Sequence, residues 1–174
     1  MQQALLIIDM LNDFVLPEGA LFVPSAREIM PDVKERLVSF RKKDNPVVFV
    51  CDQHEPDDPE FSRFGWPPHA VRGTPGSRVV EELAPLPGEH FVAKQHYSAF
   101  YQTALEKTLQ NLEVEEVILT GCVTNICVLY TAADAVMRGY RVRVPKSCVA
   151  SLTEEEGKFA LDQMERVLKA VVER

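Results

Sequence analysis

Residues 46–54 read Pro-Val-Val-Phe-Val-Cys-Asp-Gln-His, and this stretch decides the fold class. Residues 47–50 are apolar at every position, so a strand here would bury both of its faces. Strands of this kind occur in parallel sheets that helices cover on both sides. The apolar run then gives way to Asp52 and His54, whose side chains can act as ligands, acids or bases.

Similar short apolar runs recur along the chain and alternate with helical patterns. We expect strands at residues 4–8, 46–51, 89–93, 116–119 and 141–144. Ser/Thr-x-x-Glu capping boxes predict helices at residues 25–43, 103–112 and 153–172, and a further helix at 125–138 ends before Gly139. This alternation predicts an α/β fold: a single-domain Rossmann-like three-layer sandwich over residues 1–174, with a central parallel sheet and helices on both faces.

Residues 55–76 show no periodicity and contain five prolines, at positions 56, 59, 67, 68 and 75. Proline removes a backbone donor and fixes φ, so this segment is not expected to form a long regular element. Loops of this length inside a compact domain are usually functional. We therefore expect residues 55–76 to contribute to a binding or catalytic site.

Composition and charge exclude several classes of protein. The formal net charge is −7, and no Lys/Arg cluster offsets it, so nucleic acid and anionic membranes are not expected partners. The N-terminus lacks a basic segment, its apolar run is too short for a signal peptide, and no apolar stretch approaches membrane-spanning length. We expect a cytoplasmic protein, in which the four cysteines are free thiols.

Chemically reactive side chains follow several of the predicted strands. Asp9 ends the first strand, Asp52 and His54 follow the second, Lys94 ends the third, and Cys127 opens the helix after the fourth. In parallel α/β sheets, ligands bind beyond the carboxyl ends of the strands. The strand assignments therefore predict that these five side chains meet at one edge of the sheet.

Cys127 is the candidate nucleophile of this group. A thiol attacks a carbonyl as the thiolate, and the helix N-terminus and Lys94 are expected to lower the pKa of Cys127. Asp9 would accept the thiol proton and later deliver it to a leaving amine. Taken alone, Cys127 would fit a small buried apolar residue, Asp9 a turn cap and Lys94 a solvated strand end. Three reactive types on one edge favour the catalytic interpretation.

The same edge carries the donors of a candidate metal site. Asp52, His54, Glu60 and His69 supply two imidazoles and two carboxylates. This donor set suits one divalent ion, Zn first, with Fe or Mn as alternatives, in an open site that keeps water. The competing interpretation is an exposed polar loop without a metal.

Four stretches of sequence surround these candidate residues: 8–14 (Ile-Asp-Met-Leu-Asn-Asp-Phe), 52–54 (Asp-Gln-His) with 66–74 (Trp-Pro-Pro-His-Ala-Val-Arg-Gly-Thr), 94–100 (Lys-Gln-His-Tyr-Ser-Ala-Phe) and 121–128 (Gly-Cys-Val-Thr-Asn-Ile-Cys-Val). Together they resemble the nicotinamidase/pyrazinamidase family of the isochorismatase-like cysteine hydrolases. The aspartate, lysine and cysteine alone would indicate only the superfamily, whereas the metal loop narrows the resemblance to this branch.

The resemblance implies roles for individual residues. It makes Asp9, Lys94 and Cys127 the catalytic residues. It also implies a cis peptide bond between Cys122 and Val123, and an oxyanion hole formed by the backbone N–H groups of Val123 and Cys127.

Further implications concern the metal and the substrate. Asp52, His54 and His69 match the metal ligands of the family, and Glu60 stands where the fourth ligand varies between His and Glu. Phe14 and Trp66 match positions that pack on the substrate ring, although core packing or loop anchoring would also explain them.

The function implied is metal-dependent hydrolysis of a small aromatic amide, nicotinamide to nicotinate and ammonia, through a cysteine thioester. One alternative is a related amidase that acts on a carbamoyl or maleamate-like amide. Another is a non-catalytic binding module of the same fold. A redox site formed by Cys122 and Cys127 has the wrong spacing for C-x-x-C. Apolar residues on the helix after Cys127 could support a homo-oligomer.

Overall fold

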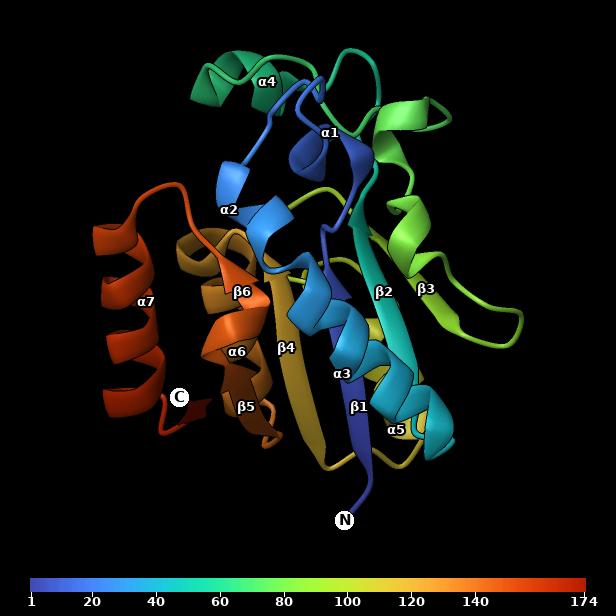
Figure 1. The fold of residues 1–174 in the computed structure, drawn as a ribbon, viewed down its shortest axis with the longest axis vertical. Coiled ribbons are helices and arrows are strands. Elements are labelled where there is room, and N and C mark those ends of the chain that lie inside the picture. The colour runs from blue at the N-terminus through green and yellow to red at the C-terminus, as the bar shows by residue number, and fades with distance from the viewer.

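The computed structural model describes residues 1–174 and is built around one seven-stranded sheet (Figure 1). The strands lie in the order β3-β2-β1-β4-β5-β7, β6 pairs with β4, and all pairs are parallel. This confirms the predicted α/β sandwich and all five predicted strands. The strands are β1 (Gln3–Ile8), β2 (Val47–Asp52), β3 (His90–Lys94), β4 (Glu116–Cys122), β5 (Arg141–Pro145), β6 (Val149–Ala150) and β7 (Val171–Glu173).

Helices cover both faces of the sheet because its central strands are apolar on both sides. In β1, Leu6 and Ile8 point into one core, whereas Leu5 and Ile7 point into the other. The first core packs against α5, α6 and α7, and the second against α1, α2 and α3 (Figure 1). The helices are α1 (Asn12–Val15), α2 (Pro24–Glu28), α3 (Met30–Lys42), α4 (Pro59–Phe64), α5 (Leu105–Asn111), α6 (Leu129–Met137) and α7 (Glu154–Arg166).

The helix predicted at residues 25–43 was wrong as a single element, because the chain forms α2 and α3 instead. Pro31 lies in the first turn of α3, where its missing N–H costs nothing, whereas inside one continuous helix it would break a hydrogen bond. Ser25 does not cap a helix. It lies inside α2 and donates its hydroxyl to the Ser151 carbonyl at 2.5 Å.

The end of the last predicted helix was also wrong. Thr153 is the N-cap of α7, as its capping box predicted, and accepts a hydrogen bond from the Glu156 N–H at 3.2 Å. However, α7 ends at Arg166 rather than near residue 172, and Lys169 adopts φ +58°. The β-branched pair Val171 and Val172 belongs to β7, which pairs with β5. This pairing gives hydrogen-bond partners to backbone groups that would otherwise face water.

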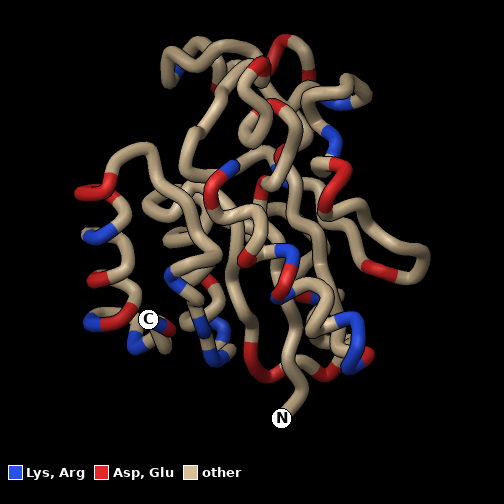
Figure 2. Tube along the Cα trace, viewed as in Figure 1, with Lys and Arg blue, Asp and Glu red and all other residues tan.

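Three further features complete the fold. The proline-rich loop contains one short helix, α4, and ends near a 3₁₀ turn at Pro75–Ser77, the first of three such turns with Glu81–Leu83 and Lys146–Cys148. Lys/Arg and Asp/Glu residues are interspersed along α3 and α7 (Figure 2). None of the helices is both long enough and apolar enough to span a membrane.

Gly121 is the position in β4 where the sheet tolerates no side chain. Its φ is +105°, and a Cβ atom there would lie 1.9 Å from the carbonyl oxygen of Ile8 on the neighbouring strand. We expect Gly121→Ala to lower the free energy of unfolding by about 3 kcal/mol, from backbone strain plus overpacking. Urea titration followed by circular dichroism measures this change.

Gly139→Ala is the matched control for this prediction. Gly139 follows α6 with φ +86°, and no atom lies within 4 Å of its would-be Cβ. Its replacement therefore adds only left-handed backbone strain, about 1 kcal/mol. Equal losses of stability in the two variants would show that contact with β1 is not the cause.

Candidate active site

The carboxyl ends of β1, β2 and β3 bring the predicted residues together. Asp52 and Lys94 are register partners on adjacent strands and therefore point to the same face. Asp9 follows β1 with φ +52°, and its N–H still pairs with the Val50 carbonyl at 2.9 Å. Its carboxylate turns back to accept the Asp52 N–H at 2.8 Å, which fixes Asp9 beside β2.

Lys94 lies at the centre of this group and is fully buried. Its Nζ pairs with the Asp9 carboxylate at 2.8 Å, contacts the Asp52 carboxylate, and donates to Cys127 Sγ at 3.3 Å. Burial alone would lower the pKa of Lys94, but Asp52 and Asp9 outweigh it and raise this pKa well above its ordinary value. Lys94 is therefore a permanent cation that holds two carboxylates and one thiol around it.

The two carboxylates differ in their affinity for a proton. Burial and the charge of Asp52 raise the pKa of Asp9 to about 6, although Lys94 opposes the rise. Burial would also raise the pKa of Asp52, but Lys94 and His54 outweigh it and lower this pKa to about 2. Asp52 is thus a fixed anion, whereas Asp9 can exchange a proton near neutral pH.

Cys127 lies in a π-helical turn, Thr124–Val128, which joins β4 to α6. The expectation that its pKa is lowered was wrong. Burial raises the pKa of the Cys127 thiol well above its ordinary value; Lys94 opposes the rise and Asp9 adds to it. Burial and the negative charges of Asp9 and Asp52 destabilise the thiolate more than the Lys94 ammonium stabilises it. The resting residue is a thiol, and it needs a base to become a nucleophile.

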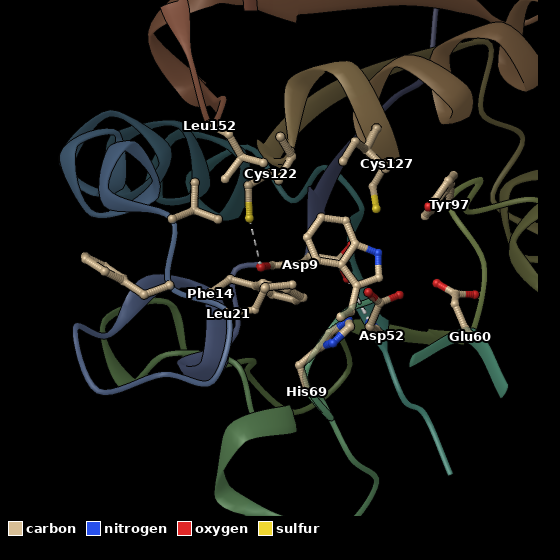
Figure 3. A pocket seen from close by; sticks show the side chains of 15 residues that line it. Asp9, Phe14, Leu21, Asp52, Glu60, His69, Tyr97, Cys122, Cys127 and Leu152 are labelled. Carbon is tan, nitrogen blue, oxygen red and sulfur yellow. Dashed lines mark hydrogen bonds between the residues drawn. The ribbon is translucent and has the colours of Figure 1, made fainter. Parts of the chain in front are cut away.

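Cys122 is held apart from this chemistry. Its thiol is buried and donates to the Asp9 carbonyl at 3.2 Å (Figure 3), so Cys122 supports the backbone of Asp9. The four cysteines, 51, 122, 127 and 148, are all free, as predicted. The peptide bond between Cys122 and Val123 is cis, as the resemblance implied, and the Val123 N–H donates no hydrogen bond to the rest of the backbone.

Asp52, His54 and His69 form a buried group that fits a metal ion. One donor atom from each lies within 4.8 Å of the others. The proline-rich loop returns to β2 through a short parallel bridge in which the His54 N–H donates to the Ala70 carbonyl at 3.1 Å, and this places His69 beside His54.

The chemistry of these donors also suits a cation. His54 Nε2 is buried without a hydrogen-bond partner and lies 3.8 Å from the Asp52 carboxylate. Burial alone would lower the pKa of His54, but Asp52 and Asp58 raise it to about 9, because both carboxylates favour positive charge at this imidazole; a bound metal ion would take the place of the Nε2 proton. Burial lowers the pKa of His69, which keeps that imidazole neutral and able to coordinate. The structure therefore brings three of the four predicted metal ligands together.

Glu60 lies beside this group but outside it. It belongs to α4, and its carboxylate is 3.7 Å from His96 Nδ1. Burial raises the pKa of Glu60. The predicted fourth ligand therefore reaches the pocket without joining the three-residue group.

One pocket, with about 590 Å³ of space including its opening to solvent, extends from the Cys127 thiol to Asp52 and His69 of the metal group. Cys127 and Asp52 point into it, with Glu60 and Tyr97 on one side and Phe14 and Leu21 on the other (Figure 3). The predicted ring-packing residues Phe14 and Trp66 both line it, and Phe14 contacts the His69 ring at a centroid distance of 5.5 Å. The remaining lining is mostly apolar: Phe22, Val23, Cys122, Val123, Ile126 and Leu152, with Asp9 and His69.

Asp13 supports the pocket, and the sequence interpretation gave it no role. Its carboxylate accepts the Ala20 N–H at 3.1 Å and the Ala70 N–H at 2.8 Å, and it packs against Gly76. Asp13 therefore ties the first loop to the loop that carries His69. Its place in the Asn-Asp-Phe stretch was the signal that could have identified it.

Fold and site together define a class: a parallel α/β hydrolase with a buried aspartate, lysine and cysteine at the carboxyl edge of its sheet. Residues 3–174 match the isochorismatase domain, and the chain belongs to this family of hydrolases.

Three solved structures share the whole fold of this chain. The nicotinamidase PncA from Bacillus subtilis is 33% identical, with a TM-score of 0.94 and 100% of both chains covered. The N-carbamoylsarcosine amidase from Thermoplasma acidophilum is 37% identical, with a TM-score of 0.90, covering 100% of this chain and 96% of the other. The pyrazinamidase of Pyrococcus horikoshii, in complex with zinc, is 32% identical, with a TM-score of 0.90 and coverages of 99% and 98%. The chain is therefore similar to amidases that act on different substrates.

Proposed function

We propose that this protein is a metal-dependent amidohydrolase that converts nicotinamide to nicotinate and ammonia. The observation that carries the proposal is one pocket that is lined by Cys127 and by two members of the metal group, Asp52 and His69, with His54 beside them. The similarity to nicotinamidases and pyrazinamidases supports the same substrate class.

Asp9, Lys94 and Cys127 divide the chemistry between them. Asp9 takes the thiol proton of Cys127 as the sulfur attacks the carboxamide carbon, and the carbonyl π electrons move to oxygen. Lys94 stays positive and compensates the negative charge that develops beside it. The C–N bond then breaks, and the proton held by Asp9 leaves with ammonia.

The second half of the reaction restores the enzyme. Water attacks the thioester carbon while Asp9 accepts a proton from that water, and the C–S bond breaks to give nicotinate. The proton returns to Cys127. Backbone N–H groups of Val123 and Cys127 hold the oxyanion in both halves, a contribution of roughly 3 kcal/mol per donor.

A divalent ion would be held by Asp52, His54 and His69, with Zn favoured by the imidazole and carboxylate donors, and Fe or Mn as alternatives. When bound, such an ion supplies positive charge and open coordination positions for water or a ring nitrogen. Phe14 and Trp66 line the pocket and would orient an aromatic ring between them.

The charges of the pocket favour a neutral amide over an anionic one. Its lining contains Asp9, Asp52 and Glu60 but no lysine or arginine. Lys94 lies behind Asp9 and Asp52 and already pairs with both. N-carbamoylsarcosine and maleamate each carry a carboxylate, which would find no unpaired lysine or arginine side chain in this lining. An uncharged aromatic amide would instead pack against the apolar side chains of the lining, such as Phe14 and Trp66.

Ammonia release from nicotinamide tests the proposal. We expect metal-loaded protein to release ammonia, and chelator-treated protein to lose most of this activity and regain it when Zn is restored. Elemental analysis of the same samples should give about one ion per chain, the number that one group of three ligands predicts.

The charge argument is tested in the same assay. We expect kcat/KM for nicotinamide to exceed that for N-carbamoylsarcosine at least about 100-fold, because like charges in contact cost several kcal/mol. A folded, metal-loaded sample that hydrolyses only N-carbamoylsarcosine would contradict the substrate and keep the cysteine hydrolase mechanism. If the protein hydrolyses neither amide, the proposed substrate is wrong and another small amide takes its place.

A further inference from the structure

Asp58 is half-buried at the junction between the metal group and α4, and none of the reaction steps above uses it. It is the N-cap of α4, and its Oδ1 accepts the Glu60 N–H at 2.9 Å. Its Oδ2 lies 2.9 Å from His54 Nδ1. One carboxylate therefore bonds simultaneously to a ligand of the metal group and to the first turn of the helix that carries Glu60.

The partner of His54 Nδ1 decides which ring nitrogen faces the metal group. A carboxylate oxygen can only accept, so His54 Nδ1 carries the proton in this contact. In a neutral imidazole the lone pair then lies on Nε2, which is the buried nitrogen without a partner beside Asp52. His69 is oriented by the same logic, because its Nδ1 donates to the Pro67 carbonyl at 2.8 Å.

The helix that Asp58 caps lies directly over the two imidazoles. Phe61 of α4 packs against His54 and His69 at ring centroid distances of 5.2 and 5.3 Å. Its side chain is only 7% exposed. The position of α4 and the orientation of His54 are therefore linked through one residue.

We propose that Asp58 is a positioning residue for the metal site: it selects the His54 tautomer that presents Nε2 and holds α4, with Glu60, over the site. Ligand imidazoles that lose such a partner typically lose 10- to 100-fold in metal affinity. The inference rests on the metal site of the proposed function and not on the identity of the amide.

Asp58→Asn tests the proposal sharply because asparagine remains a good N-cap but offers one acceptor instead of two. If its oxygen keeps the Glu60 N–H, its NH₂ group faces His54 Nδ1 and favours the opposite tautomer. If the amide instead places its oxygen toward His54 Nδ1, its NH₂ group faces the Glu60 N–H, and the N-cap hydrogen bond is lost. Asp58→Ser is the second variant, because serine can cap the helix but offers no carboxylate to His54.

Asp57→Asn is the matched control. Asp57 is the exposed neighbour of Asp58, so its replacement makes the same change of charge without touching His54. Calorimetric titration of metal-free protein with Zn alone should show the Kd raised roughly 10- to 100-fold by Asp58→Asn and Asp58→Ser, and unchanged by Asp57→Asn. Thermal unfolding of the metal-free variants verifies that each is folded.

Nuclear magnetic resonance of the histidine ring nitrogens separates a change in the orientation of His54 from a general disturbance of the metal site. In ¹⁵N-labelled, Zn-titrated wild-type protein, we expect His54 to show a proton on Nδ1 and the shift of a coordinated nitrogen at Nε2. Asp58→Asn should lose this pattern, while His69 retains its own Nδ1 proton.

Unchanged Zn affinity in both Asp58 variants, or wild-type coordination through Nδ1, would overturn the inference. A wild-type protein that binds no Zn would also overturn it. Failure of nicotinamide turnover alone would not, because neither measurement requires the reaction.

Discussion

Cys127→Ala is expected to lower the rate of ammonia release by about 10⁴-fold or more. The substitution removes the only atom that can form the thioester, and the remaining groups of the site cannot replace it. The substitution removes only one sulfur atom from a buried side chain, so the variant should fold, and its metal content should equal that of the wild type. The rate of ammonia release from nicotinamide at saturating substrate measures the effect.

Cys148→Ala is the control for this experiment. Cys148 is also a buried free thiol, but it packs into the core on the other face of the sheet. It should retain the wild-type rate, so that loss of any buried thiol is not the explanation. A Cys127→Ala protein with the wild-type rate would disprove covalent catalysis by this residue.

Lys94→Met is expected to produce the largest loss of stability. Lys94 is fully buried between Asp9 and Asp52, and its removal leaves two buried carboxylates without a counter-charge. Breaking a buried ion pair in this way costs about 3–5 kcal/mol. Urea unfolding should show this decrease, whereas Lys107→Met, at an exposed position, should change stability by less than about 0.5 kcal/mol.

The same substitution should also lower activity, roughly 10³-fold, through Asp9. Lys94 lowers the pKa of Asp9, which is about 6 in its presence. Without the ammonium this pKa rises, so a larger fraction of Asp9 is protonated at neutral pH and cannot accept the Cys127 proton. The pH dependence of kcat/KM in Lys94→Met should shift to higher pH if enough activity remains to measure.

A double variant tests whether charge is the cause. Lys94→Met with Asp52→Asn removes one of the two uncompensated carboxylates, and we expect it to recover part of the lost stability while staying inactive. A double variant that is less stable than Lys94→Met would indicate that lost packing around the lysine stem, and not burial of charge, explains the effect.

The sequence by itself determined the sheet and the residues at its edge. Apolar runs such as residues 47–50 fix where strands form, and parallel strands of similar length end together. Asp9, Asp52, Lys94 and Cys127 could therefore be placed together from a one-dimensional pattern. The pattern alone left a metal-free polar loop open for the two histidines, and the family resemblance assigned them to the metal site, where the structure brings them together with Asp52.

Local signals were weaker where a distant contact decided the outcome. The capping box at Ser25 was overridden because its hydroxyl bonds to the Ser151 carbonyl, 126 residues away. The last residues formed β7 rather than more helix because β5 offered them an open edge. Neither partner is visible in a short window of sequence.

Only the tertiary structure decided the electrostatics of the site. The sequence placed Lys94 near Cys127 and so predicted a lowered pKa, but burial and two carboxylates raise it instead. The roles of Asp13 and Asp58 likewise depend on which backbone N–H or ring nitrogen each carboxylate meets. Residue type and order determine which groups arrive at the sheet edge, whereas desolvation and hydrogen-bond geometry depend on every atom packed around them.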